Sequence, residues 1–165
     1  MRPIRAACLG AATLVILTCT SVAAGAATDT DSAHAGGKAR IITLRAVVKE
    51  LNRFPVHDGS VSQGDRVVAR SDLSYLSDEA RTKIGETAVT CTTTQGGDDE
   101  AEQCIATYTL PDGQLTVQGM YFNYLDQGPF DNAITGGTGK YEKARGSVHS
   151  EPIEPGVRRF TINLV

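Results

Sequence analysis

From Arg40 onward, apolar and polar side chains alternate along most of the chain. Successive side chains of an extended strand point to opposite faces, so this alternation predicts strands with one buried face and one solvent-facing side. In the first segment, the even-numbered positions from Ile42 to Val48 are apolar and form the predicted buried face. Comparable patterns recur near residues 67–75, 89–92, 106–110, 115–121, 132–135, 144–148 and 160–164.

Turn residues separate these segments. Pro111, Asp112 and Gly113 predict a hairpin turn, because proline presets the backbone of the first turn residue and glycine accepts a positive φ. Residues 136–139 mark a second break, and residues 151–156 mark a third. Short strands at near-regular spacing, with no long helix, predict an all-β sandwich or barrel. An eight-stranded barrel has an interior that side chains fill or that holds one small ligand.

Residues 1–26 have the features of a secretory signal peptide. Arg2 and Arg5 precede an apolar run over residues 6–22, and the small residues 23–27 offer Ala-x-Ala cleavage sites. The apolar run is shorter than the roughly 20 residues of a membrane-spanning helix, and polar residues follow it. We therefore expect the segment to be cleaved, which predicts a secreted, extracellular protein without membrane contact after cleavage.

The mature chain is expected to begin near Gly25 or Ala27. A lipoprotein signal that ends before Cys19 is the alternative interpretation. After cleavage, residues 27–39 are small and polar without apolar periodicity, which predicts a disordered leader. Residues 40–165 are then expected to form one β-domain.

The negative net charge bears on which partners the protein can bind. The chain has a formal net charge of -3, and loss of Arg2 and Arg5 with the signal takes it to -5. Nucleic acid and anionic membranes both attract clustered Lys and Arg, so neither is an expected partner of an acidic secreted domain. The isolated histidines and the absence of a ligand spacing predict no metal site.

Cys91 and Cys104 are the cysteines that remain after cleavage, and a pair in an exported chain favours a disulfide. If the two face each other in an antiparallel hairpin, the register pairs predicted inner-face residues with one another: Val89 with Ala106, and Thr87 with Tyr108. Every pair lies on the same face, so the register is self-consistent.

Acidic residues gather between these cysteines, at the predicted hairpin tip. Asp98, Asp99, Glu100 and Glu102 match no calcium-loop template. We therefore expect all four side chains to be solvated.

The first strand also contains an anomaly. If the even-numbered buried face continues past Val48, Glu50 and then Asn52 lie on the inner side. A glutamate is rarely buried without a partner, because desolvation of its charge is unfavourable. Two interpretations follow from periodicity: the strand ends near Lys49 and Glu50 lies in water, or Glu50 and Asn52 form a functional pair in an apolar cup.

Several segments resemble the allene oxide cyclases in order and spacing: residues 48–52 (VKELN), 84–91 (IGETAVTC), 113–119 (GQLTVQG) and 133–141 (AITGGTGKY). The glycine-rich segment, followed by Ala144-Arg145-Gly146, is also similar to the dirigent proteins, which share the same barrel. The resemblance implies a single eight-stranded antiparallel β-barrel with a hydrophobic pocket and no cofactor.

Allene oxide cyclases close an unstable fatty-acid epoxide to a cyclopentenone. In that family a glutamate stabilises the developing positive charge, and an asparagine helps to hold the water that binds the epoxide oxygen. These residues match Glu50 and Asn52, which the resemblance therefore implies as catalytic and inward-facing. The family's pocket cysteine matches Cys91, which a disulfide would remove as a free thiol.

The implied function is an isomerase-like one: a secreted barrel that binds a small hydrophobic molecule and directs its cofactor-free cyclisation or isomerisation. Two alternatives stay open, a dirigent-like auxiliary that orients radical coupling with a separate oxidase, and a ligand-binding barrel without chemistry. Association into a homo-oligomer is also open. The pocket is expected to be lined by Leu44, Val48, Leu73, Val89, Tyr108, Tyr121 and Phe160.

Overall fold

The computed structural model describes residues 39–122 and 128–165. The predicted signal peptide, its cleavage sites and the leader up to residue 38 lie outside these residues. The strands are β1 (Arg40–Phe54), β2 (Arg66–Tyr75), β3 (Gly85–Gln95), β4 (Ala101–Leu110), β5 (Gly113–Phe122), β6 (Phe130–Gly137), β7 (Gly146–Glu154) and β8 (Val157–Leu164). A 3₁₀ turn, η2 (Gly139–Tyr141), follows β6.

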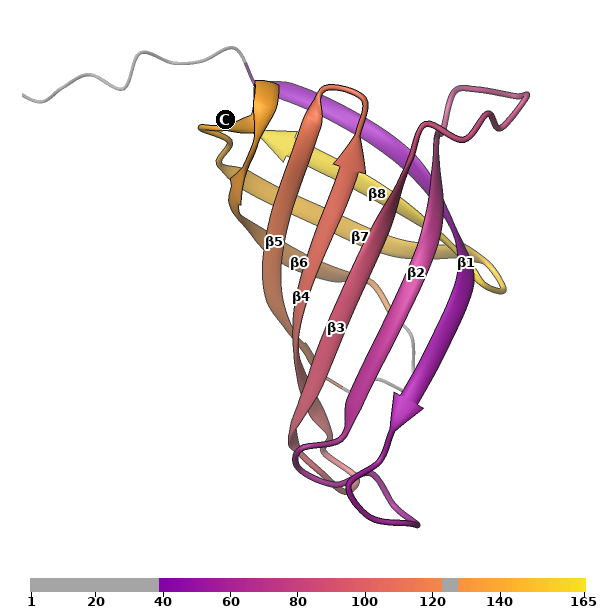
Figure 1. Cartoon of the computed structure of the whole chain (residues 1–165), viewed down its shortest axis with the longest axis vertical. Helices are drawn as coiled ribbons and strands as arrows, with labels where there is room; N and C mark the ends of the chain where they lie inside the picture. The colour runs from indigo at the N-terminus through magenta and orange to yellow at the C-terminus, as the bar shows by residue number, and fades with distance from the viewer. Residues whose placement is uncertain (1–38, 123–127) are drawn as a thin grey trace, which may run out of the picture. The chain divides into compact units, whose positions relative to one another are not determined.

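The eight strands form one closed barrel in chain order (Figure 1). Each strand pairs antiparallel with the next, and β8 pairs with β1 to close the sheet. The predicted single antiparallel barrel is therefore confirmed, and closure leaves the sheet without exposed edges. In the described part of the chain, no helix is long and apolar enough to cross a membrane.

The alternating pattern of the sequence places the apolar side chains inside. At the end of the barrel where β1 begins and β8 ends, these side chains fill the interior. Burial of each large aliphatic side chain contributes about 1.5–3 kcal/mol relative to its exposure. The packed half includes Ile42, Leu44, Leu73, Leu115, Val117, Ile134, Val148 and Ile162.

The β4–β5 hairpin turns over Pro111 and Asp112, as the sequence predicts. Gly113 has a φ of 137°, a region that favours glycine, and a side chain there would collide with the backbone carbonyl of Thr138. The Lys140 Nζ lies 2.7 Å from the Asp112 Oδ1. This turn therefore joins the hairpin to the segment that follows β6.

The opposite end of the barrel is less completely filled. Its smaller apolar cluster contains Val67, Cys91 and Cys104, with Val89 and Tyr121 packed against it. The region lies where β1, β3, β5 and β7 end and where β2, β4, β6 and β8 begin, and it is the part of the interior that remains open.

Candidate functional site

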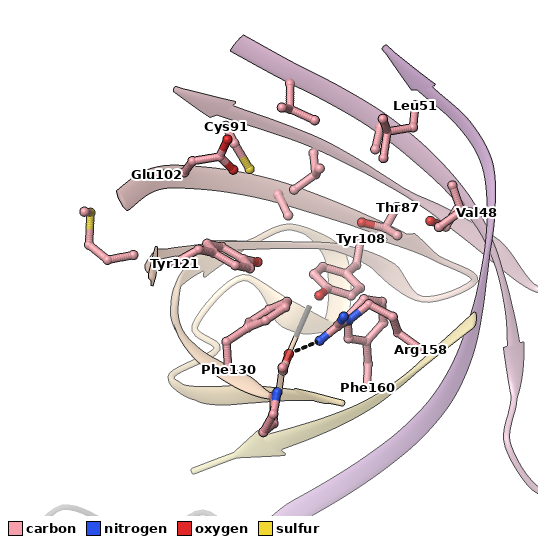
Figure 2. A pocket seen from close by; sticks show the side chains of 18 of the residues that line it. Val48, Leu51, Thr87, Cys91, Glu102, Tyr108, Tyr121, Phe130, Arg158 and Phe160 are labelled. Carbon is pink, nitrogen blue, oxygen red and sulfur yellow. Dashed lines mark hydrogen bonds between the residues drawn. The ribbon is translucent and has the colours of Figure 1, made fainter. Parts of the chain in front are cut away.

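A cavity with a volume of about 470 Å³ occupies this open end of the barrel. Its wall is mainly apolar and includes five aromatic side chains, which is typical of a site for a small organic molecule. Figure 2 shows side chains from several strands converging on this space. The lining residues include Val48, Leu51, Ala69, Val89, Cys91, Glu102, Ala106, Tyr108, Met120, Tyr121, Phe122, Phe130, Arg158 and Phe160.

Most of the residues expected to line a pocket are in this wall. The structure places Val48, Val89, Tyr108, Tyr121 and Phe160 around the cavity. The other expected lining residues, Leu44 and Leu73, are fully buried in the packed half instead. They support the closed end of the barrel and do not contribute to the cavity surface.

Glu50 and Asn52 do not face the interior, so the expected inward placement is wrong. The register of β1 against β2 shifts between Val48, which pairs with Ser71, and Glu50, which pairs with Arg70. The extra residue, Lys49, is a β-bulge, and a bulge reverses the face on which later side chains lie.

Beyond the bulge, Leu51 takes the inner position and lines the cavity. Glu50 lies on the outer surface with 62% of its side chain exposed, and Asn52 is also exposed. The carboxylate Oε1 of Glu50 accepts a hydrogen bond from the Arg70 Nη2 at 2.9 Å. This hydrogen bond raises the pKa of Arg70, and Asp72 and Glu86 add to the effect. Glu50 is therefore a member of a solvated ion network.

Of the described residues that line the cavity, Glu102 is the one carboxylate. Only 1% of Glu102 is exposed, and its Oε2 is buried without a hydrogen-bond partner in the described structure. Desolvation raises the pKa of this carboxyl; the charge of Arg53 lowers it, and the charges of Glu100 and Asp65 raise it. A buried carboxylate that opens into an apolar cavity can accept a hydrogen bond from a ligand or act as a base.

The expectation that the acidic residues 98–102 are all solvated is thus wrong in part. Asp98 and Asp99 are exposed, but Glu100 and Glu102 are buried. For Glu102 the reason is that β4 begins at Ala101, so that the even-numbered inner face of this strand already includes it.

Tyr121 carries a polar group into the cavity wall. Its hydroxyl accepts a hydrogen bond from the Asn132 Nδ2 at 3.1 Å, and its ring lies 4.0 Å from the ring of Phe130 (centroid to centroid). Burial raises the pKa of Tyr121 to about 12, so the hydroxyl keeps its proton at neutral pH. Tyr108 packs edge-on against Phe160 at 5.2 Å between ring centroids, and burial raises its pKa also.

Arg158 is the one cation among the described lining residues. Its Nε donates to the Ser150 Oγ at 2.7 Å, and its Nη2 donates to the Gly128 carbonyl at 2.7 Å. The guanidinium carbon lies 4.6 Å from the ring centroid of Phe130, a cation–π distance. Figure 2 shows Arg158 and Glu102 on different sides of the cavity, so its polar groups are separated by aromatic rings.

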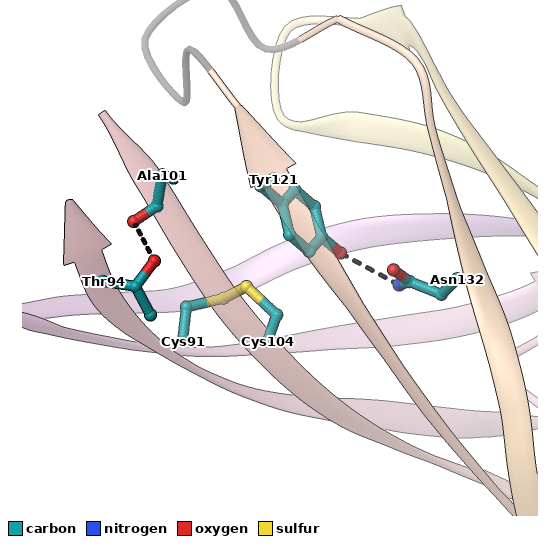
Figure 3. Close-up of a disulfide and its surroundings, with 6 residues drawn as sticks. All are labelled: Cys91, Thr94, Ala101, Cys104, Tyr121 and Asn132. Atoms are coloured by element: carbon teal, nitrogen blue, oxygen red, sulfur yellow. Dashed lines mark hydrogen bonds between the residues drawn. A yellow bond between two sulfur atoms is a disulfide. The ribbon is translucent and has the colours of Figure 1, made fainter. Parts of the chain in front are cut away.

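The predicted disulfide is confirmed. Cys91 of β3 and Cys104 of β4 are bonded, with their Cα atoms 4.0 Å apart (Figure 3). The register agrees with the expected one: Val89 pairs with Ala106, and Thr87 pairs with Tyr108.

The disulfide involves two of the three residues whose side chains could otherwise hold a metal ion together. Among the described residues, one cluster brings potential ligand atoms together: those of Cys91, Glu102 and Cys104 lie within 4.8 Å of one another. The two sulfurs are bonded to each other, so they are not thiolates, which are the form that binds metal. The cluster therefore does not form a metal site in the oxidised protein.

Sequence reasoning missed Glu102, Arg158 and Phe130. A signal was present for the first two, because both continue an even-numbered inner face: Glu102 precedes Cys104 and Ala106 in β4, and Arg158 precedes Phe160 in β8. Polar residues at such positions are usually assigned to strand ends in water.

Comparison with known proteins gives a family and a fold. Residues 50–163 match the family model described as "Allene oxide cyclase barrel like domain". No curated protein sequence matches the chain significantly.

Solved structures with the same fold include a pyocyanin demethylase, with 21% identity and a TM-score of 0.67, covering 76% of this chain and 100% of that one. A second is the Diels Alderase AbmU from Streptomyces koyangensis, with 20% identity and a TM-score of 0.65, covering 77% of this chain and 63% of that one. A third is a pterocarpan synthase dirigent protein, with 15% identity and a TM-score of 0.56, covering 76% of this chain and 86% of that one. At these identities the similarity shows the shared barrel.

Proposed function

The chain belongs to the allene oxide cyclase barrel-like domain family, and we propose that it binds one small hydrophobic molecule in its cavity and promotes a cofactor-free cyclisation or isomerisation of that molecule. The observation that carries this proposal is the aromatic-lined cavity of about 470 Å³ at the open end of the barrel. Cavities of this size and lining bury most of the surface of a small ligand. Barrels with the same fold are named a pyocyanin demethylase and a Diels Alderase, which supports action on a small organic substrate.

The walls can contribute to a cyclisation in two ways. The enclosed shape selects a folded conformer of a flexible substrate, which removes part of the entropic barrier to ring closure. Fixed polar groups at the wall can stabilise charge that develops in the transition state, because they need no reorganisation. Glu102, Tyr121 and Arg158 are such groups, and Glu50 is not, because it lies outside the cavity.

A dirigent-like auxiliary is the second candidate, and the structural similarity to a dirigent protein favours it. In that role the cavity orients radicals that a separate oxidase makes, and the protein alone performs no chemistry. A homo-oligomer is compatible with both roles.

We also propose that the protein is secreted. The charge, apolar core and small-residue pattern of residues 1–26 supports export. The Cys91–Cys104 disulfide supports an oxidising compartment, since disulfides are rare in a reducing cytosol.

A cavity-filling substitution tests the binding role. Ala69→Phe introduces a ring into the cavity wall, whereas Ala88→Phe places the same ring on the exposed face of β3. Small molecules that the purified protein retains are extracted and measured by mass spectrometry. We expect wild type and Ala88→Phe to retain the same molecule and Ala69→Phe to lose it.

Equal retention by all three proteins would refute binding in the cavity. The retained molecule, or its precursor, is then incubated with the protein alone and with the protein plus a laccase. Conversion by the protein alone supports the enzyme. A change in product stereochemistry only when the laccase is present supports the auxiliary.

A further inference from the structure

Glu102 occupies a position that is unfavourable without a ligand. The side chain comes from β4 into the wall of the cavity, with 1% of the residue exposed. Its Oε2 has no hydrogen-bond partner in the described structure. Buried polar groups are almost always hydrogen-bonded, and an unpaired charged oxygen carries a larger desolvation penalty than a neutral one. A donor supplied from the cavity would remove this penalty.

Three charged side chains act on Glu102. Arg53 of β1 is the nearby cation, and two further carboxylates act on Glu102: Asp65 of the β1–β2 connection and Glu100 immediately before β4. Arg53 lies in an exposed position, where water screens its charge. Tyr121 faces Glu102 across the β4–β5 pair as a neutral phenol. The carboxylates that act on Glu102 thus outnumber the cations by two to one.

Aromatic faces adjoin the carboxylate. Tyr121 is the cross-strand partner of Glu102, and its ring packs against that of Phe130 with an interplanar angle of 58°. The face of an aromatic ring attracts cations, and more strongly in a desolvated site. Arg158 carries the opposite charge on another side of the cavity (Figure 2), where it would repel a cation. Glu102 and Arg158 thus give the cavity a negative side and a positive side, which would orient a charged ligand.

We propose that Glu102 is the recognition carboxylate of the cavity, and that the ligand is a small, mainly apolar molecule that carries a protonated amine. This inference rests on the proposed binding function and names its substrate class. The ammonium group donates to the unpartnered oxygen of Glu102 beside the ring of Tyr121. The apolar body extends along the aromatic wall toward Phe160. The repulsion from Arg158 excludes the reversed orientation.

A matched pair of probes tests the inference. 2-Naphthylmethylamine and 2-naphthylmethanol share one ring system and differ in the ammonium or hydroxyl group, and calorimetry measures the affinity of each for the purified mature protein. We expect wild type to bind the amine about 10-fold or more tightly than the alcohol, because the hydrogen bond to the amine is charge-assisted. Glu102→Gln should abolish the preference and retain binding of the alcohol. Glu100→Gln, which changes a buried carboxylate outside the cavity wall, should retain the preference.

The outcomes distinguish failure of the proposed binding function from failure of the amine preference alone. Failure of wild type to bind either probe would overturn the proposed function and this inference with it. Equal affinity for both probes, an unchanged preference in Glu102→Gln, or an equal loss in Glu100→Gln would overturn the inference alone.

A pH titration of wild type provides the check if Glu102→Gln does not fold. The preference for the amine should fall as the pH is lowered and Glu102 takes up a proton. A preference that stays constant while Glu102 is protonated would overturn the inference.

Discussion

Replacement of Cys91 and Cys104 by alanine should destabilise the barrel strongly. The bond joins residues 13 positions apart, so it closes a short loop in the unfolded chain. The chain-entropy relation gives about 3 kcal/mol for a loop of this length. Alanine keeps the Cβ atoms of both buried residues, so the loss of packing is confined to the two sulfur atoms.

The loss is measurable by heat and by urea. At about 3 to 5 °C per kcal/mol for a domain of this size, the midpoint of thermal unfolding should fall by about 10 °C. Circular dichroism follows the transition, and urea unfolding gives the free energy independently. Wild type treated with a thiol reductant should unfold like the double variant.

The adjacent pair Thr92 and Gln103 provides a matched control. These residues face each other across the same two strands, one position beyond the cysteines, with exposed side chains. Their double replacement by alanine should change stability by about 0.5 kcal/mol or less. A loss below about 1 kcal/mol in the cysteine variant, or an equal loss in the control, would refute the chain-entropy argument.

Other predictions concern Glu102, Glu50 and the residue at which the mature chain begins. The raised pKa of Glu102 means that the folded protein holds this proton more tightly than the unfolded chain does, so this group lowers stability as the pH rises above its ordinary value of 4.5. Glu102→Gln should therefore stabilise the protein against urea at pH 8 and change its stability little at pH 4. An equal gain in stability at both pH values would contradict the raised pKa of Glu102. Glu50→Gln should change stability by about 1 kcal/mol or less and leave binding of 2-naphthylmethanol unaltered, because its ion pair is solvated. A large loss of binding would place Glu50 in the site after all. N-terminal sequencing of the secreted protein should give a start near Gly25 or Ala27, and a lipidated Cys19 would exclude this.

Much of the barrel could be predicted from the sequence because the same alternation of inward and outward side chains recurs in every strand. Alternation predicts which side chains face inward, and the cysteine pair predicts the register of β3 against β4. The structure confirms this register at Val89 and Ala106. The packed half of the interior follows from the same alternation, since most of its inward-facing side chains are apolar.

The candidate site was harder to predict because it depends on where the alternation stops or changes. Extension of the inner face of β1 placed Glu50 inside, and the bulge at Lys49 made that extension fail. The same extension in β4 would have placed Glu102 inside correctly, but the acidic residues beside it suggested a solvated hairpin tip. A bulge depends on how the paired strands twist and close, and the alternation within a single strand does not report it.

The bulge at Lys49 decides which side chains of β1 reach the cavity. A chain without Lys49 would pair Val48, Glu50 and Leu51 with Ser71, Arg70 and Ala69 in an unbroken ladder, so Leu51 would stay at the cavity wall. If Lys49 instead took a regular place in the ladder, every later side chain would change face, and Glu50 and Asn52 would replace Leu51 on the inner side. The chemistry of this wall therefore depends on whether one residue of β1 is paired or looped out.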